Sequence, residues 1–147
     1  MKKFLVLFLL LPVSIYVFCQ STSNYPGDVD KAFGLIKNAA FKHGYKYLIT
    51  FSEVTQAAIN VEKNTSYTVF FVYDNSKHPA PNFKAFLMTP DSAMRQKYTA
   101  KPYDLTQVGT ARAAQLNFQT KDLQGADTRP VKFEASPKAT IYVLLKK

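Results

Sequence analysis

The stretch YTVFFVY, residues 67–73, has apolar side chains on both faces when it is read as an extended strand. β-Branched and aromatic residues favour strands, and here they occupy both alternating sets of positions. A strand of this kind needs a covering layer on each side. We therefore expect residues 67–73 to lie near the middle of a sheet, with other elements packed on either face.

Two further strands are predicted before this segment. Residues 45–51 alternate between apolar and more polar side chains, as a half-buried strand does. Residues 57–61 form a second apolar run, and the polar residues 62–64 lead from it directly into the central strand. A connection this short predicts a hairpin.

The rest of the chain continues as short strands. We predict strands at residues 83–88, 110–120, 131–135 and 140–145, with loops at residues 74–82 and 121–130. The intervening segment is ambiguous. Residues 94–100 fit a strand, and residues 103–105 fit the start of a helical turn.

One helix is predicted near the start of the chain, at residues 27–43. Four apolar side chains are spaced there by four, three and four residues, which places them on one stripe: Val29, Phe33, Ile36 and Ala40. Asp28 and Asp30 lie in the first turn and Lys42 in the last, as the helix dipole favours. Gly44 then stands where a left-handed residue ends the helix.

These elements predict a mainly β fold. About seven short strands after one N-terminal helix favour a two-sheet antiparallel β-sandwich, with the helix lying over an open end or face. We expect a signal peptide at residues 1–19, a flexible leader at 20–26 and a single domain at 27–147.

The signal peptide is predicted from the first nineteen residues. Lys2 and Lys3 precede an apolar run of fifteen residues, Phe4 to Phe18. At helical rise this run spans about 22 Å, against about 30 Å for a hydrocarbon core. Export to the periplasm or the cell exterior is therefore expected.

Cys19, the only cysteine, has two interpretations. A signal peptidase cuts after it, so that Gln20 begins the mature chain, or Cys19 is retained and lipidated, as in bacterial outer-membrane lipoproteins. Tyr16 and Phe18 depart from the usual lipoprotein pattern. Only the second interpretation attaches the protein to a membrane. The first leaves a mature chain without thiols, which excludes disulfides and thiolate metal sites.

The charge of the chain bears on its partners. The net charge is +9, and without Lys2 and Lys3 seventeen basic residues stand against ten acidic ones, a net charge of +7. The basic residues are dispersed, which is typical of a solvated surface, while attraction to an anionic glycan or lipid is the alternative. No nucleic-acid-binding motif is present, and we expect no nucleic-acid partner.

No pattern in the sequence predicts catalysis. The chain has two histidines, His43 at the end of the predicted helix and His78 in the loop DNSKHPAPN, and no GxSxG, HExxH, phosphate-binding glycine loop or EF-hand motif. We therefore expect no enzyme activity, no catalytic residues, no metal and no cofactor. A small hydrolase using His78 with Asp74 or Glu53 is the remote alternative.

The best candidates for ligand contact lie in the ambiguous segment. Basic and aromatic side chains are interleaved there, at Arg95, Lys97, Tyr98, Lys101 and Tyr103. If this segment is a loop, these residues form a contact surface, to which the loop residue His78 is added. If it is an edge strand, the lysines protect the edge from aggregation.

The function expected from the sequence is binding. An exported, noncatalytic domain acting through contacts with a secreted or cell-envelope protein fits the signal peptide and the rhythm of strands. A binding module for an anionic glycan or lipid is the alternative. The pattern resembles no family closely enough to name one.

Overall fold

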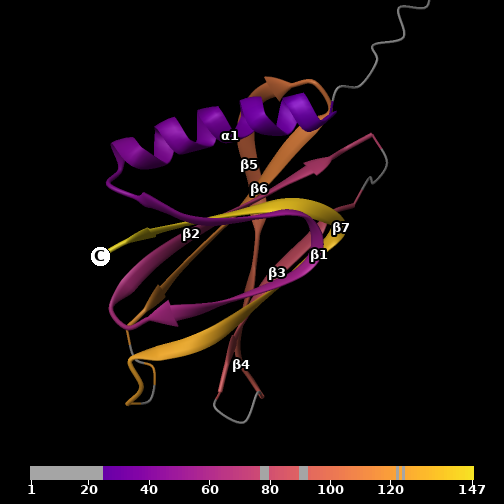
Figure 1. Cartoon of the computed structure of the whole chain (residues 1–147). Coiled ribbons are helices and arrows are strands. Elements are labelled where there is room, and N and C mark those ends of the chain that lie inside the picture. The colour runs from indigo at the N-terminus through magenta and orange to yellow at the C-terminus, as the bar shows by residue number, and fades with distance from the viewer. Residues whose placement is uncertain (1–24, 77–79, 90–92, 122, 124) are drawn as a thin grey trace, which may run out of the picture.

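A computed structural model describes residues 25–147, apart from 77–79, 90–92, 122 and 124 (Figure 1). One helix is followed by seven strands: α1 (Tyr25–Lys42), β1 (Lys46–Glu62), β2 (Thr65–Asp74), β3 (Asn82–Met88), β4 (Met94–Thr99), β5 (Lys101–Val108), β6 (Ala111–Thr120) and β7 (Thr128–Lys146). The mainly β fold with one N-terminal helix is therefore confirmed.

All of the strand pairs are antiparallel, in the order β4-β3-β7-β2-β6-β5, with β1 on the remaining side of β7. β7 is the hub of this sheet. Its first half, residues 131–136, pairs with β3, and its second half, residues 140–146, pairs with β2. β1 pairs with both halves.

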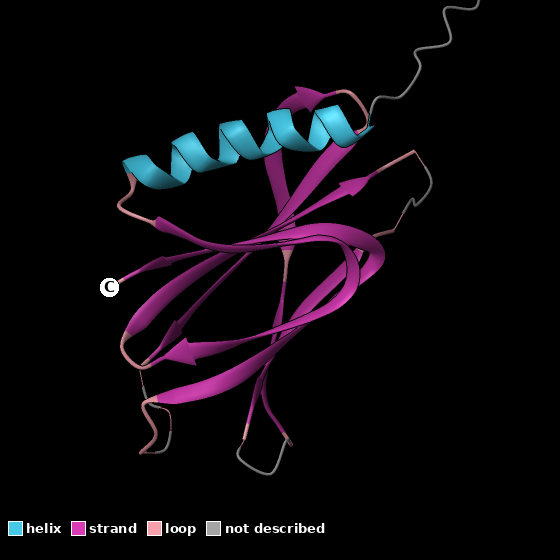
Figure 2. Ribbon diagram, in the orientation of Figure 1, coloured by secondary structure: helices cyan, strands magenta, loops and turns pink. Residues whose placement is uncertain are grey.

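β1 and β7 turn back on themselves together (Figure 2). Their register shifts twice near the turn, between the pairs Phe51↔Ile141, Val54↔Ala139 and Gln56↔Glu134. Such bulges allow a strand to bend and to pass from one layer to the next. The two ends of β7 consequently come close to Glu62. This residue pairs with Thr128, and its carboxylate lies 2.7 Å from Nζ of Lys147, the residue that follows β7.

The expectation of two separate packed sheets is therefore corrected. The seven strands form one continuous hydrogen-bonded sheet that is nearly closed, like a barrel. β4 and β5 stand at the two ends of the strand order although only Ala100 separates them in the chain. The sheet curls because its longest strands bend, a consequence of bulges that alternation patterns do not reveal.

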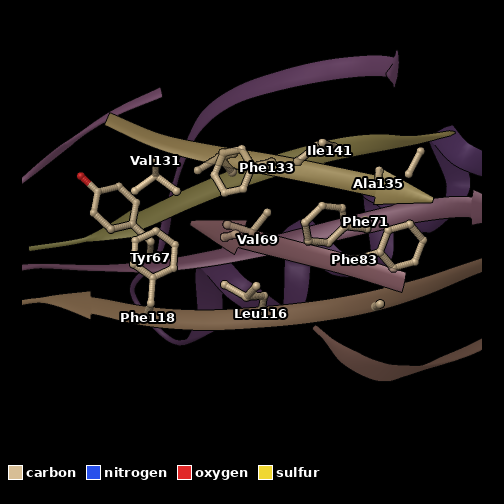
Figure 3. Packing of buried hydrophobic residues seen from close by; sticks show 14 of the residues in the cluster. Tyr67, Val69, Phe71, Phe83, Leu116, Phe118, Val131, Phe133, Ala135 and Ile141 are labelled. Atoms are coloured by element: carbon tan, nitrogen blue, oxygen red, sulfur yellow. The ribbon is translucent and has the colours of Figure 1, made fainter. Parts of the chain in front are cut away.

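The main core fills the inside of this curved sheet (Figure 3). Aromatic rings dominate it, with Phe71 stacked on Phe83 at 4.9 Å and Tyr67 on Phe118 at 5.1 Å between ring centroids. Phe133 and Ile141, from the two halves of β7, are fully buried in the same cluster. One core thus joins both halves of the bent strand.

A second core lies on the outer face, under α1. Val29, Ala32, Ile36 and Ala40 of the helix pack there with the outward-facing side chains of three strands: Phe70, Val72, Ala111, Ala113, Tyr142 and Leu144. β2 is therefore buried on both faces, as its sequence predicts. The helical stripe is confirmed, and Gly44, at φ +80°, ends the helix region in the left-handed conformation.

Some boundaries differ from those predicted. The strands predicted at residues 45–51 and 57–61 are parts of one long strand, β1, which begins at Lys46, and residues 131–135 and 140–145 belong to another, β7. Residues 103–105 lie in a strand, β5, rather than in a helical turn. The predicted hairpin is wrong, because β1 pairs with β7 while β2 pairs with β6 and β7.

Candidate interaction surface

The basic and aromatic residues predicted to contact a ligand lie on β4 and β5. Lys97 and Lys101 are exposed on these strands. Arg95 belongs to β4, and its side chain lies outside the described part of the structure. β4 and β5 each pair with one other described strand, so the lysines stand on edge strands, where charge hinders edge-to-edge aggregation.

The two tyrosines of this group are on opposite faces of the sheet. The ring of Tyr98 lies 5.2 Å from that of Phe118, against the inner core. Tyr103 meets Phe70 edge-on at 5.0 Å, against the outer core under α1. The structure therefore does not gather Tyr98 and Tyr103 into one patch. Contact of the individual residues with a ligand stays a prediction.

The remaining predicted residues fall elsewhere. His78 and Cys19 lie outside the described residues. Asp74 ends β2, where its Oδ1 accepts a hydrogen bond from the Ser76 amide at 2.9 Å, a turn contact. Glu53 lies in the bend of β1, 2.9 Å from Nζ of Lys138.

The most extensive accessible edge in the structure belongs to β1. Among the described strands, only β7 pairs with it. Of the seventeen residues of β1, Val61 alone is buried. A long strand with one side available can accept a further strand through its main-chain N–H and C=O groups. This edge is not apparent from the sequence, because alternation does not show which strands lie outermost in a sheet.

Three consecutive apolar side chains are exposed at the start of this edge. Tyr47 is 47% exposed, Leu48 41% and Ile49 37%. The register shifts between Tyr47 and Ile49, so that Leu48 is the extra residue of a bulge. An accessible apolar cluster on an edge strand is typical of an interaction site.

The side of α1 that faces β1 extends this surface. Phe33, Lys37 and Phe41 are spaced by four residues and therefore share one side of the helix. The Phe33 ring stacks on Tyr142 at 4.1 Å and meets Tyr47 edge-on at 6.0 Å. Phe41 is 42% exposed, with Nζ of Lys37 5.4 Å from its ring centre. We call Phe41, Tyr47, Leu48 and Ile49 the apolar edge patch.

A hollow of about 290 Å³ lies beside the bend of β1. Its lining includes two carboxylates and a tyrosine, contributed by α1, β1 and β7: Asp30, Glu53 and Tyr142, with Pro26, Val29, Ser52 and Thr140. Burial, followed by the negative charge of Asp30 and the proximity of Tyr47, raises the pKa of Tyr142 from 10.0 to about 12. Tyr142 is therefore a neutral packing group at physiological pH.

Two tyrosines of the inner core have altered acidity for the same main reason. Burial raises the pKa of Tyr67 above 10.0, although the hydrogen bond from the Glu62 amide to its hydroxyl, at 2.8 Å, acts in the opposite direction. Burial likewise raises the pKa of Tyr73, against the opposing effect of Arg112. These hydroxyls serve packing and hydrogen bonding near neutral pH.

Comparisons with known protein families, curated proteins and solved structures found no match. Within the described residues, no group of three or more His, Cys, Asp and Glu side chains is arranged to hold a metal ion. No helix in the described part of the chain is long and apolar enough to cross a membrane.

Proposed function

We propose that this protein is an exported, noncatalytic binding domain and that it acts by accepting an extended segment of a partner protein along β1. The observation that carries this proposal is the accessible side of β1 next to the apolar edge patch. Main-chain hydrogen bonds would hold the segment in register, and the apolar side chains would select its sequence.

The apolar contact alone would support only weak binding. Burying a side chain of this size contributes about 1.5–3 kcal/mol, and a little under half of Tyr47, Leu48 and Ile49 is still exposed. Covering all three would therefore contribute about 2–4 kcal/mol, whereas a millimolar dissociation constant already requires about 4 kcal/mol. Pairing along the strand is needed in addition.

Export is part of the proposal and is supported by the charged start and apolar run of residues 1–19. The partner is accordingly a secreted or cell-envelope protein. The intact mass of the natural protein tests this step. A chain beginning at Gln20, or at a lipidated Cys19, supports export to the periplasm, the exterior or the outer membrane, whereas a chain that retains Met1 overturns it.

Site-specific photo-crosslinking tests the binding surface. A benzoylphenylalanine residue replaces Leu48 in one variant and Leu35 in the control, and both are expressed in the native cells. Leu35 is 47% exposed, like Leu48, but it lies on α1 outside the apolar edge patch. We expect a discrete adduct from position 48 and none from position 35.

The nature of the adduct decides the outcome. An adduct with another protein, abolished by Ile49→Lys, supports the proposal. An adduct between two copies of the chain, together with a dimer in sedimentation velocity, overturns the proposed binding of a partner protein and shows self-association at β1 instead. The absence of any adduct from position 48, or equal adducts from both positions, overturns it.

A second candidate, binding of an anionic glycan or lipid, is favoured by one row of residues on the outer face of β3, β4 and β7. Cross-strand pairing places Phe86 between Lys97 and Lys132. The lysines can attract anionic groups, although Glu134 lies 3.1 Å from Nζ of Lys132 and reduces its effect. Nonspecific attraction would disappear at moderate salt.

A resin of acidic polysaccharide tests this candidate. The double variant Lys97→Glu/Lys132→Glu is compared with Lys31→Glu/Lys121→Glu, which has the same net charge. Earlier elution of the first variant alone, in moderate salt, supports a site on this face. Equal elution of the two variants shows attraction by net charge only and overturns it.

A further inference from the structure

A cleft opens on the outer face of the sheet beside the C-terminal end of α1. It has a volume of about 260 Å³ and lies between the helix and strands β2, β5 and β6, and none of its lining residues belongs to the apolar edge patch. Its lining comprises two alanines and five side chains that carry polar groups: Ala39, Ala40, His43, Tyr45, Thr68, Tyr103 and Gln115.

Two tyrosines form the aromatic part of the lining. Tyr103 is held in place by the edge-on contact of its ring with Phe70. Tyr45 follows the end of the helix, and its amide donates a hydrogen bond to the Ala40 carbonyl at 3.2 Å. Both side chains are half-buried against the outer core. The two rings are therefore positioned by the fold while part of each remains accessible.

The base of the cleft is an ordered polar pair. Thr68 is 2% exposed, and Nε2 of Gln115 donates a hydrogen bond to its hydroxyl at 3.0 Å. Nε2 of Gln115 also donates to Oδ1 of Asn117 at 3.2 Å. These two bonds use both amide hydrogens of Gln115. Its Oε1 has no hydrogen-bond donor among the described residues, and it is held ready to accept one.

The remaining polar groups also have unused capacity. Within the described structure, no hydrogen bond engages the hydroxyls of Tyr45 and Tyr103 or the imidazole of His43. A tyrosine hydroxyl can both donate and accept a hydrogen bond, and the imidazole ring has two nitrogens available for hydrogen bonding. The cleft thus offers several hydrogen-bonding groups around a partly aromatic wall.

The charge of the lining is the third observation. The chain carries a net charge of +9, yet the cleft is lined by no Asp, Glu, Lys or Arg. Nζ of Lys146 lies beside the lining, 3.1 Å from the His43 carbonyl oxygen, to which it donates a hydrogen bond, but no such charged side chain forms part of the lining itself. A ligand rich in neutral hydroxyl groups can pair with the hydrogen-bonding groups of the lining. One apolar face of such a ligand can pack against a tyrosine ring.

From these observations we infer that the cleft binds one ring of a neutral sugar. The ring's C–H face would lie against Tyr103 or Tyr45, and its hydroxyls would pair with Gln115, His43 and the tyrosine hydroxyls. Sites for drug-sized ligands begin at about 300 Å³, so a volume of about 260 Å³ suits a single ring better than a longer ligand. With so few contacts, a dissociation constant of about 1 mM is expected.

Titration of the full-length mature protein in ¹⁵N–¹H NMR tests this inference. The probes are the methyl glycosides of glucose, galactose and N-acetylglucosamine, with methyl glucuronoside as the anionic comparison and glycerol as the nonspecific one. We expect saturable shifts at residues 43–45, Tyr103 and Gln115 with at least one neutral glycoside. The shifts should be weaker with the glucuronoside and absent with glycerol.

Two variants make the test specific to the cleft. Gln115→Leu removes the accepting Oε1 and should weaken binding at least fivefold. Gln119→Leu is the matched control, because Gln119 is exposed on the same face of β6, four residues farther along, and it should leave binding unchanged.

The outcomes are decisive and independent of the crosslinking at β1. The inference is overturned if no neutral glycoside shifts the cleft residues, if glycerol shifts them equally, or if the two variants bind alike. Should Gln115→Leu lose the fold, as judged by its NMR spectrum, Tyr103→Phe replaces it. That variant removes one hydroxyl and keeps the ring, and it should weaken binding by at least twofold, with unchanged affinity counting against the inference.

Discussion

The carboxylate of Glu53 lies 2.9 Å from Nζ of Lys138, and this ion pair joins β1 to β7 at the bend that both strands share. Glu53 also has φ +53°, in the left-handed region. Both side chains are well exposed, at 37% and 63%, and surface ion pairs contribute at most about 1 kcal/mol. The main-chain conformation of Glu53 therefore matters at least as much as its charge.

Replacement of Glu53 separates these two effects. Glu53→Gly and Glu53→Ala both remove the ion pair, but only glycine adopts a positive φ without a steric cost. We expect Glu53→Gly to be more stable than Glu53→Ala by about 1 kcal/mol, as measured by urea denaturation. Equal stabilities would mean that the bend does not require the left-handed conformation.

Two native glycines, Gly109 and Gly34, provide a matched pair of substitutions. Gly109 has φ +52°, and a Cβ at this position would meet the carboxylate of Asp28, whereas Gly34 lies inside α1 with open space around it. We expect Gly109→Ala to destabilise the protein by about 1–2 kcal/mol. Gly34→Ala should stabilise it by about 0.5–1 kcal/mol, because alanine favours the helix. Thermal denaturation of both variants checks the opposite signs.

The inner core depends strongly on Phe71. This ring is fully buried between Phe83 and Phe133. Phe71→Ala should cost about 3–5 kcal/mol through lost burial and the cavity left behind, which approaches the whole stability of a small domain. Phe71→Leu is the measurable variant, and we expect a loss of about 1–2 kcal/mol in urea denaturation. A loss below 0.5 kcal/mol, roughly the effect of a neutral surface change, would contradict the assigned packing.

Stability should fall at alkaline pH because of Tyr142. Its pKa in the folded protein is about 12, raised from 10.0 mainly by burial, so the folded state holds the proton more tightly than the unfolded state. The stabilising effect is complete below pH 10 and is lost as the pH rises through 12. A pKa difference of two units between the folded and unfolded states corresponds to a loss of folding stability of about 3 kcal/mol at most.

Urea denaturation at pH 8 and pH 11.5 measures this loss. Tyr142→Phe keeps the stacking with Phe33 and removes the ionising hydroxyl, so its stability should fall less over the same interval. Tyr67 and Tyr73, whose pKa values are raised in the same direction, still titrate in that variant and leave a residual decrease. A fall of the same size in Tyr142→Phe would contradict the role assigned to Tyr142.

The candidate sites could be predicted only in part. Tyr103 is a contact residue that the sequence predicts and His43 is not, and the cleft that contains both requires the end of α1 to lie over β5 and β6. Tyr98 and Tyr103 are five residues apart, and Ala100 and the register of two edge strands send them to opposite faces. An odd spacing already places two side chains on opposite faces of an extended chain, so the sequence concealed this separation only because residues 94–105 fit a strand, a turn or a loop.

The apolar edge patch was hidden for a related reason. Tyr47 and Ile49 fit the alternation of a half-buried strand, and that pattern is the same whether a strand lies inside a sheet or at its margin. Glu53 carried no sequence signal for a bend, because the left-handed conformation is normally indicated by glycine, or sometimes asparagine or aspartate, and not by glutamate.

The order of residues alone determined the helical stripe of α1, its end at Gly44 and the double-sided burial of residues 67–73, since each depends on periodicity within a few residues. Only the tertiary structure decided that β1 and β7 pair along their whole lengths, bend together and leave one side of β1 accessible. Pairing joins residues as far apart as Lys46 and Leu145. Such contacts are selected by the fit of the complete core, and main-chain hydrogen bonding, which is common to nearly all residues, does not distinguish among possible partners.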